Sequence, residues 1–332
     1  MAPAGNELVW DGRPGHYEVY YLTLTDPRAG VGCWIRYTLL SPLAGGDAPS
    51  AALWFLAMDP RPRATPVFAR RSTYPIEALT HAGDELALGP ARLDARSATG
   101  ELPGCAWELR YEPSALRYEH IHPLLRRVAD TQLVLPQADL TIDGWVTISG
   151  ERLELRGARG GQAHLWGGAH ARRWAWVHCN DFRDLDGTPQ PGSVLDAVSA
   201  VVRRAGREVG PNTPVVGRFE GEDFVSRSPI RVLANDSRFA LSGWSFTATA
   251  GSRRLIAEVD APRRLIAGVT YHDPDGEPAY CYNTETATLR VQVLHRARRV
   301  GGWMHRATLL AEGRAHFEYG QREPVRDVEL LL

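Results

Sequence analysis

Three tryptophans and three histidines fall within nineteen residues, between His164 and Phe182. Successive side chains of a β-strand point to opposite sides. If a strand begins at Arg172, one of its faces therefore carries Trp174, Trp176, His178 and Asn180. Aromatic rings with a histidine and an amide among them are typical of an apolar pocket that binds a small molecule. A tryptophan-rich core with one hydrogen-bonded histidine is the alternative interpretation.

The same segment supplies the groups that cyclisation or hydration of a polyene requires. Such a reaction needs an acid that protonates a double bond, a water-poor cavity, and aromatic faces that stabilise the developing carbocation. We predict that His178 and His164 are catalytic acid–base groups. The predicted substrate-binding residues of this segment are Trp166, Trp174, Trp176 and Asn180.

A second segment, residues 271–286, contains an Asp-Gly turn followed by a strand pattern. Alternation places Asn283 and Glu285 on one face of that strand and Tyr282 on the other. A buried Glu285 could serve as a general acid, so it is the third predicted catalytic residue, with Tyr282 and Asn283 as predicted substrate-binding residues. An outward-facing Glu285 is the simpler alternative, because glutamate is rarely buried.

Other kinds of chemistry find little support in the sequence. His120 and His122 have the spacing that lets two histidines face one metal from a strand, but no further ligands are evident. We therefore predict no metal and expect the two histidines to lie in a solvated turn before Pro123. The four cysteines form no CxxC pair and are expected to be buried free thiols.

No cofactor is predicted. All 38 positively charged Lys and Arg positions are arginine, so no lysine amine can form a Schiff base with a carbonyl or with pyridoxal phosphate. The glycines at 157, 160 and 161 do not form a nucleotide-binding motif that follows a strand and opens a helix.

In almost every patterned segment of the chain, apolar residues recur with the period of two that is typical of β-strands. We expect these strands to position the residues named above. Clusters of Gly, Pro and Asp separate these segments at hairpin spacing. The predicted strands are 16–25, 33–40, 51–58, 106–111, 153–157, 172–179, 242–248, 254–260, 289–294 and 307–319, the last with a break near Gly313.

One segment has a possible helical pattern. Residues 193–204 could form a helix with Ser193 as its N-cap and Gly206 as its stop, or else a pair of strands. Proline-rich stretches flank it, so we expect a connecting excursion at 185–214 between an N-terminal half, 1–184, and a C-terminal half, 215–332.

The composition is that of an ordinary folded protein, with 44% hydrophobic and 23% charged residues and a net charge of −1. No nucleic-acid partner is expected from such a balance. No apolar stretch is long enough to span a membrane, and the first residues lack the pattern of a signal peptide. The sequence therefore predicts a cytoplasmic protein and specifies no oligomeric state.

The string from Trp166 to Phe182, W-G-x-x-H-x-x-R-W-x-W-x-x-C-N-x-F, resembles the central motif of tocopherol cyclases. Their lipocalin-like relatives include carotenoid 1,2-hydratase-like proteins and fungal cyclases of the Diels–Alderase type. The opening strings at 16–18 and 32–34 are similar to the start of the same group. The resemblance implies a double lipocalin-like β fold that acts on, or carries, apolar isoprenoid-like or polyketide-like molecules.

We therefore predict an all-β fold of two lipocalin-like antiparallel barrel or sandwich halves packed together, with few helices. The predicted function is that of a cyclase, isomerase or hydratase that needs no cofactor and converts a small apolar molecule in a barrel pocket. A non-catalytic carrier of a lipid or isoprenoid is the alternative from another class, and a cavity without ionisable groups would favour it.

Overall fold

The computed structural model describes residues 5–61, 65–296 and 301–332. Residues 1–4, which belong to the segment considered above for a signal peptide, lie outside the described residues. The described residues form two antiparallel sheets, one α-helix, α1 (Pro229–Ala234), and the 3-10 helices η1 (Ile76–Ala78), η2 (Pro123–Leu125) and η3 (Arg263–Leu265). The prediction of an all-β protein with few helices is confirmed.

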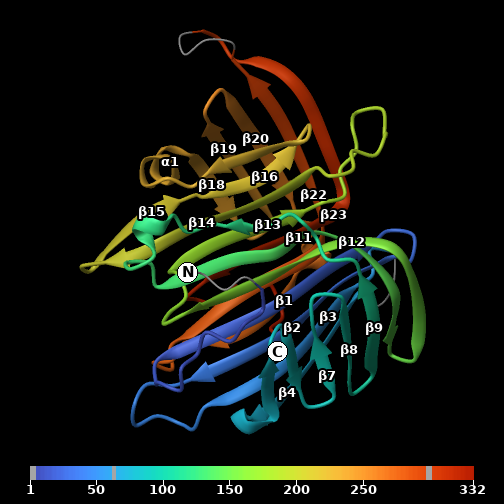
Figure 1. The fold of residues 1–332 in the computed structure, drawn as a ribbon, viewed down its shortest axis with the longest axis vertical. Helices are drawn as coiled ribbons and strands as arrows, with labels where there is room; N and C mark the ends of the chain where they lie inside the picture. Colours follow the sequence, from blue (N-terminus) through green and yellow to red (C-terminus); the bar gives the residue numbers. More distant parts are fainter. Residues whose placement is uncertain (1–4, 62–64, 297–300) are drawn as a thin grey trace.

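The first sheet is built from the N-terminal part of the chain and is coloured blue to green in Figure 1. Its strand order is β4-β3-β2-β1-β12-β11-β9-β8-β7-β6-β5, with β10 paired to β11. The strands are β1 (His16–Asp26), β2 (Val31–Ser41), β3 (Ser50–Met58), β4 (Val67–Pro75), β5 (Leu79–Ala82), β6 (Glu85–Leu88), β7 (Ala91–Leu93), β8 (Ser97–Leu102), β9 (Cys105–Tyr111), β10 (Tyr118–Glu119), β11 (Thr131–Ile148) and β12 (Glu151–Gly167).

The second sheet follows in the order β17-β16-β14-β13-β23-β22-β20-β19-β18, with β15 paired to β14 and β21 to β22. Ser226 of β17 donates a hydrogen bond to the carbonyl of Thr249 in β19 at 2.9 Å, so this sheet curls into a nearly closed barrel. The strands are β13 (Arg173–Cys179), β14 (Val194–Arg204), β15 (Arg207–Asn212), β16 (Val215–Phe219), β17 (Glu222–Ser226), β18 (Asp236–Ala240), β19 (Gly243–Ala250), β20 (Arg253–Asp260), β21 (Ala267–His272), β22 (Pro278–His295) and β23 (Met304–Gln321).

Three apolar cores hold these sheets together. Each sheet wraps around a core of its own. The third core lies between the sheets, where Trp34 and Trp54 of the first meet Trp176 and Val269 of the second. Strand β1 lies against β22 and β23 at this contact, so the two halves form one packed unit (Figure 1).

Strand β13 shows how the period of two divides its side chains between these cores. Ala175 and Val177 belong to the core of the second sheet, whereas Trp174 and Trp176 belong to the core between the sheets. The predicted aromatic face of this strand is confirmed, and it points out of its own barrel toward the other half.

The helix considered for residues 193–204 is wrong. This segment forms β14, which pairs with β13 on one side and with β15 and β16 on the other. Its valines suit a strand, and the ladder bonds available on both sides outweigh the capping signals of Ser193 and Gly206.

The chain passes from the first sheet to the second between Gly167 and Arg173. The predicted division into 1–184, 185–214 and 215–332 stays a prediction about domains. The proline-rich approach to β14 leads into a central strand of the second sheet.

Candidate active site between the two sheets

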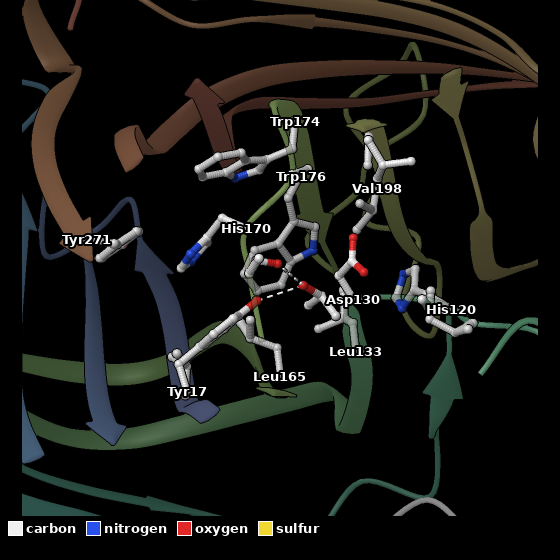
Figure 2. A pocket seen from close by; sticks show the side chains of 18 of the residues that line it. Tyr17, His120, Asp130, Leu133, Leu165, His170, Trp174, Trp176, Val198 and Tyr271 are labelled. Atoms are coloured by element: carbon white, nitrogen blue, oxygen red, sulfur yellow. Dashed lines mark hydrogen bonds between the residues drawn. The ribbon is translucent and has the colours of Figure 1, made fainter. Parts of the chain in front are cut away.

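A cavity of about 410 Å³ lies between the two sheets. Its size falls in the range of small-molecule sites. Most of its wall is apolar, and both sheets contribute (Figure 2). The lining residues used below are Tyr17, Tyr21, Arg36, His120, His170, Trp174, Trp176, Tyr271 and Glu318. The predicted barrel pocket is thus replaced by a cavity between the halves.

Trp174 and Trp176 both line this cavity and form an aromatic part of its wall. Their indole N–H groups are both occupied: Trp174 Nε1 donates to Glu318 at 2.6 Å and Trp176 Nε1 to Asp196 at 2.9 Å. With the N–H groups satisfied, the rings offer apolar and π surface to a ligand.

His170 lies in the link between β12 and β13, and it is held in one orientation by Asp273. His170 Nδ1 lies 2.5 Å from Asp273 Oδ1, and the backbone N–H of His170 donates to the same carboxylate. The imidazole ring is stacked between Tyr17 and Tyr271, with centroid distances of 4.5 and 5.5 Å. Figure 2 shows the ring between these two residues in the cavity.

Asp273 is ionised, and this sets the tautomer of His170. Burial alone would raise the pKa of Asp273, but the hydrogen bond and charge of His170 and a hydrogen bond from Arg322 outweigh it and hold the pKa below its usual value. An ionised Asp273 accepts a hydrogen bond from His170 Nδ1, so Nε2 is the ring nitrogen that this carboxylate does not contact. Among the described residues, Nε2 has no hydrogen-bond partner.

A buried ion pair crosses the sheets beside this histidine. Arg36 Nη2 lies 2.6 Å from Glu318 Oε2 and 3.1 Å from Asn283 Oδ1. The guanidinium also lies 4.3 Å from the ring centroid of Tyr21. Burial alone would raise the pKa of Glu318, but the charge of Arg36 outweighs it and the pKa lies below its usual value. The pair therefore stays ionised in the cavity wall.

Glu285 is fully buried, so the outward-facing alternative is wrong. It accepts a hydrogen bond from Tyr21 at 3.2 Å and another from Thr23, and it lies 2.6 Å from Nδ1 of His316. Glu285 does not line the cavity itself. It meets the cavity through Tyr21, which belongs to the wall.

His178 is also buried behind the wall. Its Nδ1 lies 2.9 Å from Asp196, the carboxylate that binds Trp176. His164 lies on the other face of the first sheet, where its Nε2 is 2.8 Å from Glu18 and its ring packs on Trp166 at 4.8 Å. Neither histidine is brought into contact with the cavity.

Three further predicted residues do not line the cavity. Asn180 donates to the side chain of Asp139 and to the carbonyls of Leu140 and Gly160, which ties the second half to β11 and β12. Tyr282 accepts a hydrogen bond from the backbone of Val325 and packs in the second core. Asn283 reaches the cavity only through Arg36.

His120 and His122, which were considered as metal ligands or as part of a solvated turn, have different environments. His120 is buried, so a solvated turn is wrong for this residue. His122 caps η2, with its Nδ1 accepting from the backbone of Leu124. Within the described ranges, no group of three or more His, Cys, Asp and Glu residues is placed to hold a metal ion. The four cysteines are buried free thiols, which confirms that prediction.

The residues that sequence reasoning missed are His170, Asp273, Arg36, Glu318 and Tyr21. His170 and Asp273 lie in the two segments singled out above, but they are 103 residues apart in the chain. Their pairing follows from the packing of the β12–β13 link against β21, which no local pattern encodes. The signal that the sequence offered for His170 was its position inside the aromatic segment between His164 and Phe182.

Comparison with known proteins identifies the family. The sequence model of the family described as tocopherol cyclase-like matches residues 129–319. Rv0493c and MT0513, uncharacterized proteins from two strains of Mycobacterium tuberculosis, are each 31% identical to this chain over 330 residues, covering 94% of it and 88% of the relative. The chain belongs to the tocopherol cyclase-like family, as the motif around Trp166 predicted.

Solved structures share the fold at low sequence identity. A Nitrosomonas europaea protein assigned as AttH has a TM-score of 0.57 and 11% identity, with 97% of this chain and 100% of that chain covered. CghA, solved with Sch210972, has a TM-score of 0.53 and 11% identity, with 94% of this chain and 90% of that chain covered. Kievitone hydratase from Nectria haematococca has a TM-score of 0.51 and 8% identity, with 93% of this chain and 89% of that chain covered. Named enzymes are thus among the proteins that use this fold.

No described helix has the length and hydrophobicity needed to cross a membrane.

Proposed function

We propose that this chain is an enzyme of the cyclase, isomerase or hydratase type, which converts an apolar isoprenoid-like or polyketide-like molecule in the cavity between the sheets. The observation that carries this proposal is the His170–Asp273 pair, which presents an imidazole Nε2 to an apolar cavity. A proton acceptor at that position can act on the ligand, and a carrier would have no need of it.

The surrounding residues support the same chemistry. The aromatic wall of Trp174 and Trp176 can stabilise positive charge that develops on a polyene. The apolar lining keeps water scarce, so a proton transfer from or to His170 would act on the ligand rather than on solvent. This mechanism requires no cofactor, and a cytoplasmic location stays a prediction.

The proposal is tested by native mass spectrometry of the protein after incubation with an extract of its own producing cells. We expect an apolar molecule to be bound and to be released with a changed mass or a changed isomeric form. A ligand that is recovered unchanged would instead support a carrier.

A variant of His170 makes the test specific. His170→Phe keeps an aromatic ring between Tyr17 and Tyr271 but has no nitrogen, so we expect it to bind the ligand and leave it unconverted. His305→Phe is the matched control, because His305 is exposed at the start of β23 and contacts Thr308. Conversion at the wild-type rate by His170→Phe would refute the role of this histidine.

A further inference from the structure

A second buried carboxylate, Asp196 of β14, is shared by two histidines. His178 Nδ1 lies 2.9 Å from Asp196 Oδ2, and His120 Nε2 lies 2.8 Å from Oδ1. The contact with His120 is an ion pair by distance rather than a well-aligned hydrogen bond. Burial alone would raise the pKa of Asp196, but the close contact with His120 and the hydrogen bond with His178 outweigh it and hold the pKa below its usual value.

Of these two histidines, His120 is the one that reaches the cavity. It follows β10 in the first half, is 1% exposed and belongs to the cavity lining. Its Nδ1 is buried and has no hydrogen-bond partner in the described part of the chain. His178 does not line the cavity, and its Nε2 packs against Gly161, where an added Cβ would lie 2.7 Å away.

His120 and His170 stand on opposite sides of the cavity, with Trp176 between them in Figure 2. Each ring has a buried carboxylate at one nitrogen, Asp196 or Asp273, and a second nitrogen without a protein partner. Two groups in this arrangement can exchange protons with two different positions of one bound molecule.

The charges around the two carboxylates differ. Arg322 lies 2.6 Å from Asp273, so an arginine and His170 share the negative charge of this carboxylate. Among the described residues, the cations within ion-pair distance of Asp196 are His120 and His178 alone. A carboxylate without an arginine stabilises a proton on one of the two imidazoles.

Other charged groups lie close to His120 in the chain. Arg227 donates to the carbonyls of Glu119 and Ile121, which flank His120. The carboxylate of Glu119 lies 3.4 Å from Arg227, and it also pairs with Arg126 at 2.5 Å and Arg117 at 3.7 Å. Among the described residues, Asp196 is the carboxylate within ion-pair distance of the His120 ring.

We propose that His120 is the general acid of this cavity and His170 its general base. This assignment rests on the proposed function. His120 gives the proton on Nδ1 to a substrate carbon beside Trp176, where the electron pair of a C=C bond forms the new C–H bond. An O–H or C–H bond on the other side breaks, its proton passes to His170 Nε2, and its electron pair stays in the substrate. Solvent returns both histidines to their starting states between turnovers.

The protonation states can be measured without a substrate. In ¹⁵N spectra of the histidine rings of the full chain at neutral pH, assigned through His→Gln variants, we expect both nitrogens of His120 to be protonated and one of His170. We expect Asp196→Asn to remove the second proton from His120. If Asp196→Asn does not fold, the wild-type spectrum decides, because a singly protonated His120 there would overturn the proposal.

Kinetics test the catalytic part with the substrate recovered from the extract. His120→Gln can still contact Asp196 but cannot deliver a proton, so we expect kcat to fall by about 10²-fold or more with KM changed little. His305→Gln serves as the control. A wild-type kcat in His120→Gln would overturn the assignment of His120 as the general acid. Absence of turnover in the wild-type protein would refute the proposed function. The ¹⁵N spectra would then decide whether His120 is protonated on both nitrogens.

Discussion

At the scale of single residues, this protein buries several carboxylates whose partners lower their pKa, among them Glu18, Asp196 and Glu318. Glu18 is the most heavily bonded example. It accepts from the backbone N–H groups of Val9 and Trp10, from Tyr20, and contacts His16 and His164. This network attaches the N-terminal segment to the first sheet, which is the role the structure shows for His164.

The lowered pKa of Glu18 predicts that the folding stability of this protein depends on pH. Burial alone would raise its pKa, but the bonds from His16 and His164 outweigh it and lower the pKa from 4.5 to about 2. The stabilisation is therefore complete above about pH 4.5 and is lost as the pH falls toward 2, amounting to about 3 kcal/mol. Denaturant unfolding at several pH values should show a weaker acid dependence in Glu18→Gln than in the wild type, and equal dependence would contradict this account.

The Arg36–Glu318 pair predicts an asymmetry between single and double variants. Arg36→Met leaves Glu318 buried without its counter-charge and should lower the unfolding free energy by about 3–5 kcal/mol at neutral pH. Arg36→Met combined with Glu318→Gln removes both charges and should be more stable than Arg36→Met alone. Equal losses in the two proteins, measured by denaturant titration, would show that the buried charge is not the cause.

At the scale of elements, the aromatic wall depends on a glycine of the neighbouring strand. Gly320 of β23 lies opposite Trp174 of β13, and an added Cβ would come within 2.0 Å of the indole. Gly320→Ala should push Trp174 toward the cavity, reduce ligand binding and cost about 1–3 kcal/mol of stability. Gly302→Ala, where an added Cβ meets nothing within 4 Å, is the control. Unchanged ligand affinity in Gly320→Ala would show that Trp174 does not shape the site.

How far the sequence predicts these elements depends on whether the signal is local. The alternation in 16–25 and 172–179 gives β1 and β13, and the aromatic face of β13 is the one expected. The break expected near Gly313 is wrong, because β23 continues through this residue, which has a φ of 62° and lies where the pairing with β22 shifts register. Residues 193–204 were ambiguous because their valines and caps fit two periods, and the neighbouring strands decide between them. The contact of His170 with Asp273 joins distant segments, so only the folded sheets reveal it.

At the scale of the whole molecule, the core between the sheets makes the two halves depend on each other. Leu56 of the first sheet is fully buried there. We expect Leu56→Ala to cost about 2–5 kcal/mol and to shift one common unfolding transition, seen alike by tryptophan fluorescence and circular dichroism. Leu233→Ala is the control, because Leu233 is 63% exposed. Two separate transitions, with only one shifted by Leu56→Ala, would contradict a single cooperative unit.

The same arrangement explains why the site lies where it does. Each sheet fills its own interior with side chains, so the free space of this cavity lies where the sheets face each other. The first half supplies Tyr17, Arg36 and His120 to the wall, and the second half supplies the two tryptophans. Asp196 and Asp273, which contact His120 and His170, also belong to the second half. Neither half contains the complete site.

The most direct test of this account is a crystal structure of the full chain with the apolar molecule recovered from the cell extract. The account predicts electron density for that molecule between the sheets, against Trp174 and Trp176 and within hydrogen-bonding reach of His170 Nε2. Density inside the core of either sheet, or on the outer surface with this cavity empty, would contradict it.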